Sequence, residues 1–367
     1  MIGEEPSKIR TREAAEHDFI VRALTAVNVR DQDARDVADV LVAADLRGVE
    51  SHGIARLETF YVRRIEAGVV NARPTYTTLS DRPTQFALDA GNGLGHPPGK
   101  FAMGQAIEKA RENGVAFATV RNSNHYGIAA YYAMMALEHG MIGLSMTNST
   151  HLAVPTFGAK KTTGTNPIAV AIPAREHPPF VLDMSTTGVT FGRLEVSERK
   201  GKPLKAGWAV DGEGRETRDP LIAKTVGALL PLGGYGTDGG GHKGYGLGAL
   251  VDILCGVLAG GLFGAAADVP ETGMHGGIVG NFFGAFRIDA LRDADAFERD
   301  LDRELRTFEN SAPVPGAERV IIPGEPERAN TERYRSEGVP IDPKVWEAID
   351  TMAERLGIEK LERFTVE

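Results

Sequence analysis

Short apolar and β-branched runs alternate with helical patterns through the middle of this 367-residue chain, and this alternation constrains the fold most. Glycine, proline and asparagine separate the runs, as they separate β-strands. The strand-like runs are QFALDA, VAFATV, IGLSMT, IAVAIP and FVLDMS, all between residues 85 and 185. Helical patterns fall at 100–113, 127–139 and 188–199. Strands that alternate with helices in this way predict an α/β domain.

The two ends of the chain show amphipathic helical patterns instead. Near the N-terminus the third such pattern begins at Ser51, a predicted N-cap, and stops at Gly68. Near the C-terminus, helices are predicted at 291–310 and 342–357, with an extended proline- and glycine-rich stretch between them. We therefore predict a helical domain built from residues 10–75 plus 295–367, around an α/β domain that spans residues 76–294.

Composition narrows the function classes. The net charge of −9, without clustered basic residues, disfavours nucleic acid as a partner because its phosphates would be repelled. The single cysteine, Cys255, cannot form an intramolecular disulfide, and its apolar neighbours predict a buried structural side chain. The polar N-terminal residues lack the apolar region of a secretory signal, so we expect a cytoplasmic location.

One apolar stretch, residues 245–269, resembles a membrane span in hydropathy alone. It carries Asp252 near its middle and several glycines, which disfavour a membrane span. We therefore predict a buried core helix that ends near Gly260, and no membrane partner.

The stretch DLRGVESHGIAR, residues 45–56, places Ser51 and His52 before an apolar-periodic segment and Arg56 one helical turn later. In a helix that begins there, His52 and Arg56 lie about 5–6 Å apart on one face. An arginine binds a carboxylate through two parallel hydrogen bonds, and a nearby histidine can exchange a proton with an oxygen on the adjacent carbon. A helix N-terminus disfavours the imidazolium ion, which keeps the pKa of His52 near the useful range. The pattern fits a 2-oxo or 2-hydroxy acid; a capped surface helix is the alternative.

Two further loops carry candidate site residues. His125 lies in VRNSNHYG, where a predicted strand passes into a predicted helix, which is where α/β proteins bind ligands. Lys243 lies in GHKGYGLG, a glycine-rich stretch that opens a helix, where backbone N–H groups and an ammonium group suit a phosphate. For both, a simple turn with a solvated side chain is the alternative.

Familiar dinucleotide, zinc and serine-hydrolase motifs do not account for these residues. GYGTDG at 234–239 matches G-x-G-x-x-G, but no strand directly precedes it, so a Rossmann fold is not expected. HExxH, CxxC and GxSxG patterns are missing, and no metal site is predicted. Hydroxyl- and amide-rich strand ends at 146–150, 164–173 and 180–187 suit ribose, amide or phosphate oxygens, although turns use the same residues.

Eight motifs, in order over nearly the whole chain, resemble the type 2 malate/L-lactate dehydrogenase family. They are ADLRGVESHGIARL, LDAGNGLG, NSNHYG, TNST…VPTFG, GTNPIAVAIP, LDMSTT, HKGYGLGALVDILCGVLAGG and PGEPE. Members of the family act on malate, sulfolactate, ureidoglycolate, diketogulonate or cyclic imine 2-carboxylates. The resemblance implies a mixed-sheet, non-Rossmann fold that binds NAD or NADP, and a homodimer whose active sites lie near the subunit interface.

By position, the resemblance implies catalytic roles for His52 and His125 and substrate contacts for Ser51 and Arg56. The positions expected to contact the cofactor are Ser149, Asp183, Met184, Ser185, Lys243, Gly244, Gly324, Glu325 and Pro326. Members often carry a tyrosine four residues after the arginine, where this chain has Phe60. The adjacent Tyr61 lies on the predicted buried stripe and is assigned no chemistry. Many members have a lysine where this chain has Arg193, which bears on the choice between NAD and NADP.

We therefore hypothesise an NAD(P)-dependent oxidoreductase that acts on a small 2-hydroxy or 2-oxo acid. Arg56 holds the carboxylate, His52 protonates the new alkoxide and His125 polarises the oxygen, with the two histidine roles open to exchange. Two alternatives are a reductase of cyclic imine 2-carboxylates and a non-catalytic protein that binds small acids on the same scaffold.

Overall fold

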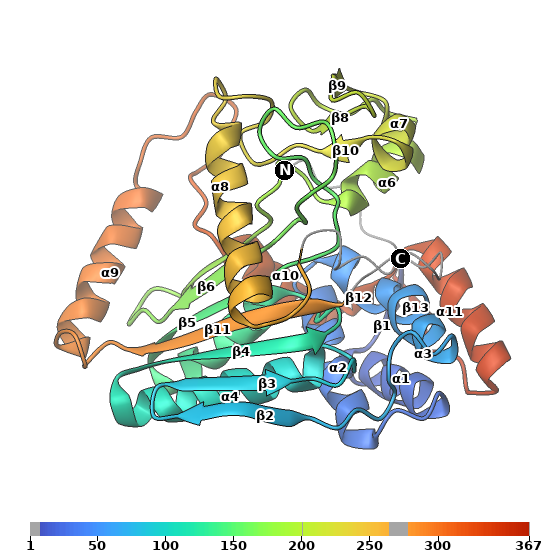
Figure 1. The fold of residues 1–367 in the computed structure, drawn as a ribbon, viewed down its shortest axis with the longest axis horizontal. Coiled ribbons are helices and arrows are strands. Elements are labelled where there is room, and N and C mark those ends of the chain that lie inside the picture. The colour runs from blue at the N-terminus through green and yellow to red at the C-terminus, as the bar shows by residue number, and fades with distance from the viewer. Residues whose placement is uncertain (1–7, 200, 264–277, 367) are drawn as a thin grey trace.

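A seven-stranded mixed sheet forms the centre of the protein (Figure 1). The computed structural model describes residues 8–199, 201–263 and 278–366. In spatial order the strands are β2 (Thr77–Arg82), β3 (Gln85–Asp89), β4 (Val115–Ser123), β11 (Val279–Arg287), β5 (Met141–Thr147), β6 (Ile168–Ile172) and β7 (Phe180–Met184). Only β3 and β4 run parallel within this sheet as described. All five predicted strands lie in it, and the predicted mixed α/β fold is confirmed.

Helices cover both faces of the sheet. On one face lie α4 (His96–Asn113) and α5 (Ala129–Met135), and on the other lies α8 (Gly241–Asp252), continued by a π-helical turn at Ile253–Leu258. Adjacent residues of β11 point to opposite faces, as strand geometry requires. Phe283 packs with the α4 and α5 side, and Phe282 packs with Cys255 on the α8 side.

The helix predicted within residues 245–269 exists, but it is not a fully buried core helix. Its last turn ends at Leu258, close to Gly260 as expected, and Gly260 has a φ of +69°. Val251 and Cys255 face the sheet and are fully buried, whereas Leu250, Ile253 and Val257 on the other side are 43%, 54% and 52% exposed. The expectation was wrong for this side because α8 is the outermost layer here and nothing in the described chain covers it. Residues 264–269 lie outside the described ranges.

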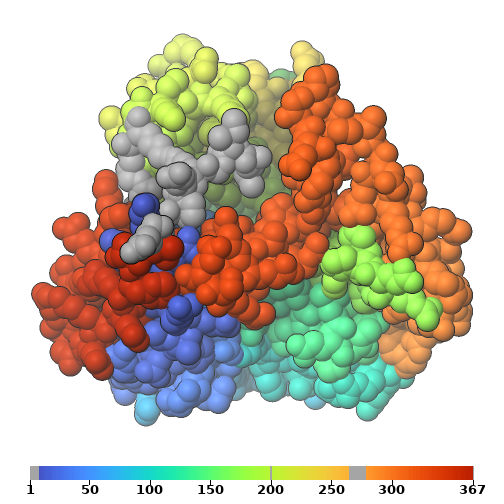
Figure 2. Space-filling view, turned by 180° about the vertical axis from the view of Figure 1, so that it is seen from behind, coloured from blue at the N-terminus to red at the C-terminus, as the bar shows by residue number. Residues whose placement is uncertain are grey.

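Both ends of the chain pack into one apolar core. A small antiparallel sheet joins β1 (Ile9–Thr11) to β12 (Val339–Pro340) and β13 (Phe364–Thr365). Around it lie α1 (Glu13–Ala26), α2 (Asp31–Leu46), α3 (Arg63–Glu66), α10 (Glu325–Glu337) and α11 (Pro343–Leu356). Figure 2 shows the C-terminal residues in red beside the N-terminal residues in blue. The predicted helical domain requires such a packing of the two ends.

Two further parts complete the described chain. A small sheet of β8 (Ala209–Val210), β9 (Glu216–Thr217) and β10 (Ala228–Leu229) packs with α6 (Phe191–Arg199) and α7 (Pro220–Thr225). Helix α9 (Ala294–Glu309) lies on the opposite side of the molecule from the terminal helices, although the predicted helical domain includes most of it (Figure 1). Its Asp302 accepts hydrogen bonds from the N–H groups of residues 175–177, between β6 and β7.

Within the described ranges, no helix combines the length and apolarity needed to cross a bilayer. The same residues contain no cluster of three or more His, Cys, Asp or Glu side chains suited to a metal ion.

Candidate active site

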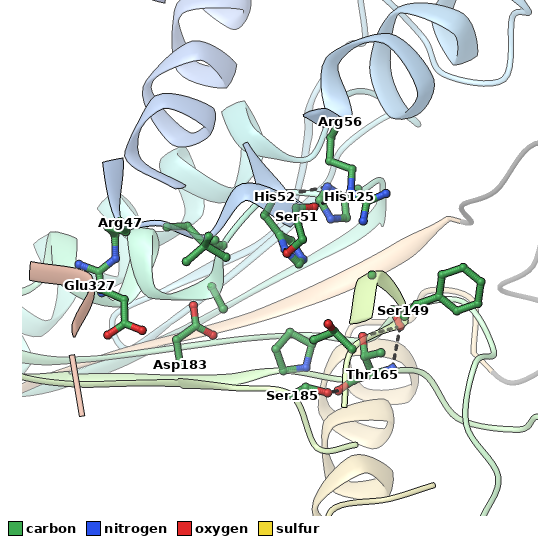
Figure 3. A pocket seen from close by; sticks show the side chains of 18 of the residues that line it. Arg47, Ser51, His52, Arg56, His125, Ser149, Thr165, Asp183, Ser185 and Glu327 are labelled. Atoms are coloured by element: carbon green, nitrogen blue, oxygen red, sulfur yellow. Dashed lines mark hydrogen bonds between the residues drawn. The ribbon is translucent and has the colours of Figure 1, made fainter. Parts of the chain in front are cut away.

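A cavity of about 710 Å³ brings together segments that lie far apart in the sequence. Its wall includes residues of the 47–60 segment, the start of α5, the ends of β5 and β7, and the residues that lead into α10. Figure 3 shows Ser51, His52, Arg56 and His125 on one side of it, opposite Ser185 and Asp183. The volume is within the range of pockets that bind small molecules and cofactors.

The segment that carries Ser51, His52 and Arg56 is not the single α-helix that its periodicity predicts. Two 3₁₀ turns, Glu50–His52 and Ile54–Arg56, are followed by a π-helical turn at Leu57–Val62 and then by α3. Ser51 caps no helix; its Oγ lies 2.9 Å from Nδ1 of His52. The prediction of an N-cap was therefore wrong, and the helix N-terminus does not act on His52 as expected.

Arg56 is held in place by its own segment. Its Nε donates to the carbonyl oxygen of Ser51 at 2.5 Å, and its guanidinium carbon lies 4.6 Å from the centre of the Phe60 ring. A cation over an aromatic face in this geometry is attracted to the ring. With Nε and one face occupied, the two terminal nitrogens are the groups available to a ligand in the cavity. Two such nitrogens form the fork through which an arginine can bind a carboxylate.

His52 and His125 lie face to face in the cavity wall. Their ring centres are 5.4 Å apart, with 25° between the ring planes. Burial and the neighbouring Arg56 lower the pKa of His52 to about 4, which lies below the range expected from the sequence. Burial, His52 and Arg56 lower the pKa of His125 as well. Both imidazoles are therefore neutral near pH 7.

Tyr61 is the site residue that the sequence analysis missed. Its hydroxyl lies 2.6 Å from Nδ1 of His125, and the N–H of Gly127 also points at that nitrogen, at 3.4 Å. A backbone N–H can only donate, so Nδ1 accepts and the proton of the neutral ring is on Nε2. Burial raises the pKa of Tyr61, which keeps its hydroxyl protonated and able to donate.

The π-helical turn explains how Tyr61 reaches His125. A π-helical turn holds one more residue than an α-helical turn. Tyr61 is the fifth residue after Arg56. In this wider turn it therefore lies on the side of the helix where an α-helix would place the fourth residue after Arg56. The resemblance places a tyrosine at that fourth position, where this chain has Phe60. The apolar spacing alone gave no signal for the wider turn.

Hydroxyl groups gather on the opposite side of the cavity. Ser149 Oγ accepts from the N–H of Thr165 at 3.0 Å, and Ser185 Oγ donates to the carbonyl oxygen of Thr165 at 3.1 Å. Thr165 thus joins the ends of two predicted hydroxyl-rich segments. These groups suit the sugar and amide oxygens of a nucleotide.

A charged cluster occupies the far end of the cavity from Ser149 and Thr165. Figure 3 shows Arg47 and Glu327 beside Asp183, whose carboxylate accepts from the N–H of Ala130 at 2.8 Å. Arg47 and Glu327 were not singled out in the sequence, because a lone arginine at a helix end and a glutamate near a helix start are common surface features.

Most of the predicted site residues line this cavity, and a few do not. Gly324 and Pro326 are part of its wall, together with Ser149, Asp183 and Ser185. The residues outside its lining are Met184, Lys243, Gly244 and Glu325. Glu325 forms an ion pair with Arg319, and Lys243 is exposed on α8. Gly244 packs so closely on Leu232 that a Cβ would lie 2.2 Å from its carbonyl oxygen.

The family model described as malate/L-lactate dehydrogenase matches residues 12–350. The chain belongs to this family. It is 44% identical to malate dehydrogenase from Pyrococcus abyssi over 344 residues, 94% of each chain. It is 34% identical to L-sulfolactate dehydrogenase from Methanocaldococcus jannaschii, over 94% of this chain and 96% of that one. The solved structure of malate dehydrogenase from Pyrococcus horikoshii OT3 matches with a TM-score of 0.89 at 41% identity, covering 98% of this chain and 100% of that chain.

Membership confirms three expectations drawn from the sequence. The family is the one that the eight motifs resemble, its mixed-sheet architecture is the one found here, and its members are dehydrogenases. The chain is thus a dehydrogenase of the malate/L-lactate dehydrogenase family.

Proposed function

We propose that the protein transfers hydride reversibly between a nicotinamide dinucleotide and a small 2-hydroxy or 2-oxo acid. The observation that carries this proposal is the convergence of Arg56, His52 and His125 on one cavity. An anion-binding fork and two imidazoles are the groups that such a reaction needs at adjacent carbons of its substrate. The relatives named for malate and sulfolactate, both 2-hydroxy acids, support the same chemistry.

The cavity fits a dinucleotide in size and in its donor groups. We propose that Ser149, Asp183, Ser185, Gly324 and Pro326 hold it, because they line the wall and correspond to the expected cofactor positions. The hydroxyl groups around Thr165 supply the neutral donors and acceptors that sugar and amide oxygens need. When bound, the nicotinamide supplies or accepts the hydride, and binding, orientation and proton transfer fall to side chains of this chain.

We assign the proton to His125, which exchanges the two histidine roles of the initial hypothesis. His125 lines the cavity, and its neutral ring carries its proton on Nε2 because Nδ1 accepts from Tyr61. As negative charge develops on the substrate oxygen, the Nε2 proton moves to that oxygen and the Tyr61 proton moves to Nδ1. Burial disfavours the tyrosinate that remains, and the positive charges of Arg56 and Arg64 partly offset this effect. His125 then takes up a proton from water that enters the cavity, and Tyr61 recovers its own proton from Nδ1. His52, whose ring faces that of His125, then orients the substrate oxygen.

We propose a substrate with a second acidic group. Lys161 lines the same cavity as Arg56 and offers a second positive charge. Malate and sulfolactate, for which two relatives are named, each carry a second anion beyond the carboxylate. Oxaloacetate is therefore expected to be a better substrate than pyruvate.

We propose NAD as the preferred cofactor. Asp183 and Glu327 together place two carboxylates beside one arginine in the charged cluster. Carboxylates accept hydrogen bonds from a ribose 2′-hydroxyl and repel a 2′-phosphate. A preference for NADP would contradict this assignment of the cluster.

We further propose that the protein is a cytoplasmic homodimer. Exposed apolar side chains on α8 and on the π-helical turn that continues it, namely Leu250, Ile253, Val257 and Leu258, are suited to contact with a second copy of the chain. A single buried cysteine is consistent with a reducing compartment.

One assay tests the proposed function. Oxaloacetate, sulfopyruvate, pyruvate and a cyclic imine 2-carboxylate are each offered with NADH and with NADPH, and oxidation of the cofactor is followed. We expect oxaloacetate or sulfopyruvate with NADH to react fastest. Turnover of the imine alone favours the imine reductase alternative. Enhanced NADH fluorescence without turnover of any of these acids favours a non-catalytic binding protein.

A further inference from the structure

Two acidic side chains are buried together beneath the segment that carries Ser51, His52 and Arg56. Glu16 of α1 is 0% exposed, and Asp45 near the end of α2 is 4% exposed. Burying an ionised carboxylate without a positive partner costs several kcal/mol. Acidic groups kept in such a place, next to a candidate active site, indicate a function rather than a contribution to stability.

Asp45 binds the backbone of the site segment directly. Its Oδ2 accepts a hydrogen bond from the N–H of Ile54 at 2.6 Å, midway between His52 and Arg56. Gly53 makes this approach possible, because a Cβ there would lie 2.0 Å from the carboxyl atoms of Asp45. This hydrogen bond therefore joins α2 to the turn between the two 3₁₀ segments.

Glu16 completes the arrangement as a proton donor. Its carboxyl group contacts that of Asp45, and no N–H group of the described chain donates to either of its oxygens. Two carboxyl groups in contact cannot both be ionised at neutral pH, so one of them keeps its proton. A protonated Glu16 is placed to give Asp45 a second hydrogen bond, beside the one that Asp45 accepts from Ile54.

We propose that Asp45, with Glu16 as its proton-bearing partner, is a positioning residue that holds the Ser51–Arg56 segment against the cavity. Through Ile54 it fixes the turn from which the Arg56 fork and the His52 ring extend. The inference rests on the proposed function, since it assigns the held segment to substrate binding. Neither carboxyl group touches the substrate in this proposal.

The arrangement also predicts a dependence on pH. Burial raises the pKa of Asp45 to about 7, and it raises the pKa of Glu16 further, with Asp45 itself as the next cause. The other charged groups that act on the pair are Glu13 of α1 and Glu50 of the preceding turn, both acidic. When Asp45 ionises, its bond to the Ile54 N–H becomes charge-assisted and stronger. The segment is therefore held more firmly above pH 7 than below it.

Stability changes in the opposite direction. A carboxyl group whose pKa is higher in the folded chain than in the unfolded chain favours the folded state at low pH. That contribution is lost as the pH rises from the unfolded value, about 4, to the folded value near 7. Asp45→Asn removes the ionisation, so its stability relative to the unsubstituted protein increases over this range.

The test combines Asp45→Asn with hydrogen exchange and steady-state kinetics. We expect the variant to lose protection of the backbone amides in a peptide that covers residues 50–56. We also expect the KM for oxaloacetate to rise about tenfold, because Arg56 is less well placed, while the KM for NADH stays the same. In the unsubstituted protein we expect kcat/KM to rise across neutral pH as Asp45 ionises, and this rise should be absent from Asp45→Asn. A merely structural loss of active protein lowers kcat and leaves both KM values and the pH profile as they were.

Two further variants make the result decisive. Glu16→Gln keeps a donor toward Asp45 and should stay within about twofold of the unsubstituted KM for oxaloacetate. Asp31→Asn removes an exposed carboxylate of α2, the helix that carries Asp45, and should change neither the amide protection nor the KM for oxaloacetate. Unchanged protection and KM in Asp45→Asn, or an equal loss in Glu16→Gln, overturns the proposal. The exchange measurement needs no substrate, so it decides the positioning role even if every acid in the panel fails to react.

Discussion

The neutral ring of His125 carries its proton on Nε2 because two donors occupy its other nitrogen, Nδ1. The Tyr61 hydroxyl and the Gly127 N–H both point at Nδ1, so the ring needs no charge to offer a proton from Nε2. His52 has no comparable constraint, since its Nδ1 faces the Ser51 hydroxyl, which can donate or accept. The difference between two otherwise similar histidines thus comes from their hydrogen-bond partners.

This difference predicts unequal losses when the side chains are removed. His125→Ala should slow hydride transfer in a single turnover by about 10²-fold to 10⁴-fold, the usual contribution of a positioned acid. Tyr61→Phe should cost about tenfold, because the phenyl ring keeps the packing and removes the donor to Nδ1. His52→Ala should cost less than His125→Ala. A greater loss in His52→Ala would restore the initial assignment, and near-normal transfer by both histidine variants would eliminate the mechanism.

Lys161 carries the expected preference for a second acidic group. Removing its charge with Lys161→Met should raise the KM for oxaloacetate about tenfold, the typical effect of losing one charge-assisted hydrogen bond. Pyruvate lacks the second carboxylate and serves as the control substrate, for which the KM should stay unchanged. Equal effects on both acids would show that Lys161 acts on the fold or the cofactor instead.

At the scale of elements, the segment from Glu50 to Glu66 shows where periodicity fails as a guide. Its apolar residues repeat at α-helical spacing, yet the chain forms two 3₁₀ turns and a π-helical turn before α3. The close approach of Asp45 at Gly53 and the pairing of Tyr61 with His125 are contacts distant in the chain, which a local pattern does not encode. The strands were predictable because their β-branched runs and glycine-rich boundaries are local signals.

The same reasoning separates the site residues that the sequence predicted from those it missed. Ser51, His52, Arg56 and His125 stand in polar stretches between apolar patterns, so they were visible as candidates. Tyr61 fits an apolar stripe, and its hydroxyl contact became visible only with the π-helical turn in place. The prediction that Cys255 is a buried structural side chain is confirmed, since it is fully buried against the sheet.

Gly53 is the residue on which the turn between the two 3₁₀ segments depends. Gly53→Ala would place a Cβ 2.0 Å from the Asp45 carboxyl group, so one of the two must move. We expect a loss of about 1–3 kcal/mol in the free energy of unfolding, measured with urea, and a raised KM for the 2-oxo acid. Gly104→Ala on α4 is the matched control, because a Cβ there meets nothing within 4 Å. That variant should be neutral or slightly stabilising.

At the scale of the whole molecule, the two ends of the chain close one side of the active-site cavity. The segment before α3 supplies Arg56 and His52, and the start of α10 supplies its N-cap Gly324 and Pro326. Both are anchored in the apolar core that the N- and C-terminal helices share. A cavity built from both ends forms only after the whole chain has folded.

Among the residues that the structure describes, an apolar surface on α8 and on the π-helical turn that continues it is left uncovered. Ile253 and Val257 are 54% and 52% exposed and lie four residues apart, so two charged substitutions there would disrupt a single surface. We expect the double variant Ile253→Asp, Val257→Asp to change the protein from dimer to monomer in sedimentation equilibrium. Leu291→Asp is the control, because Leu291 is 85% exposed and apolar but belongs to the segment between β11 and α9. It should leave the dimer intact.

Steady-state kinetics of the double variant test whether the dimer is needed for activity. If a second copy helps to complete each site, the monomeric variant loses kcat/KM in proportion to the loss of dimer. Raising the protein concentration should then restore both together, since association depends on concentration. An unsubstituted protein that sediments as a monomer, or a double variant that remains dimeric, would contradict the assignment of this surface to a second copy.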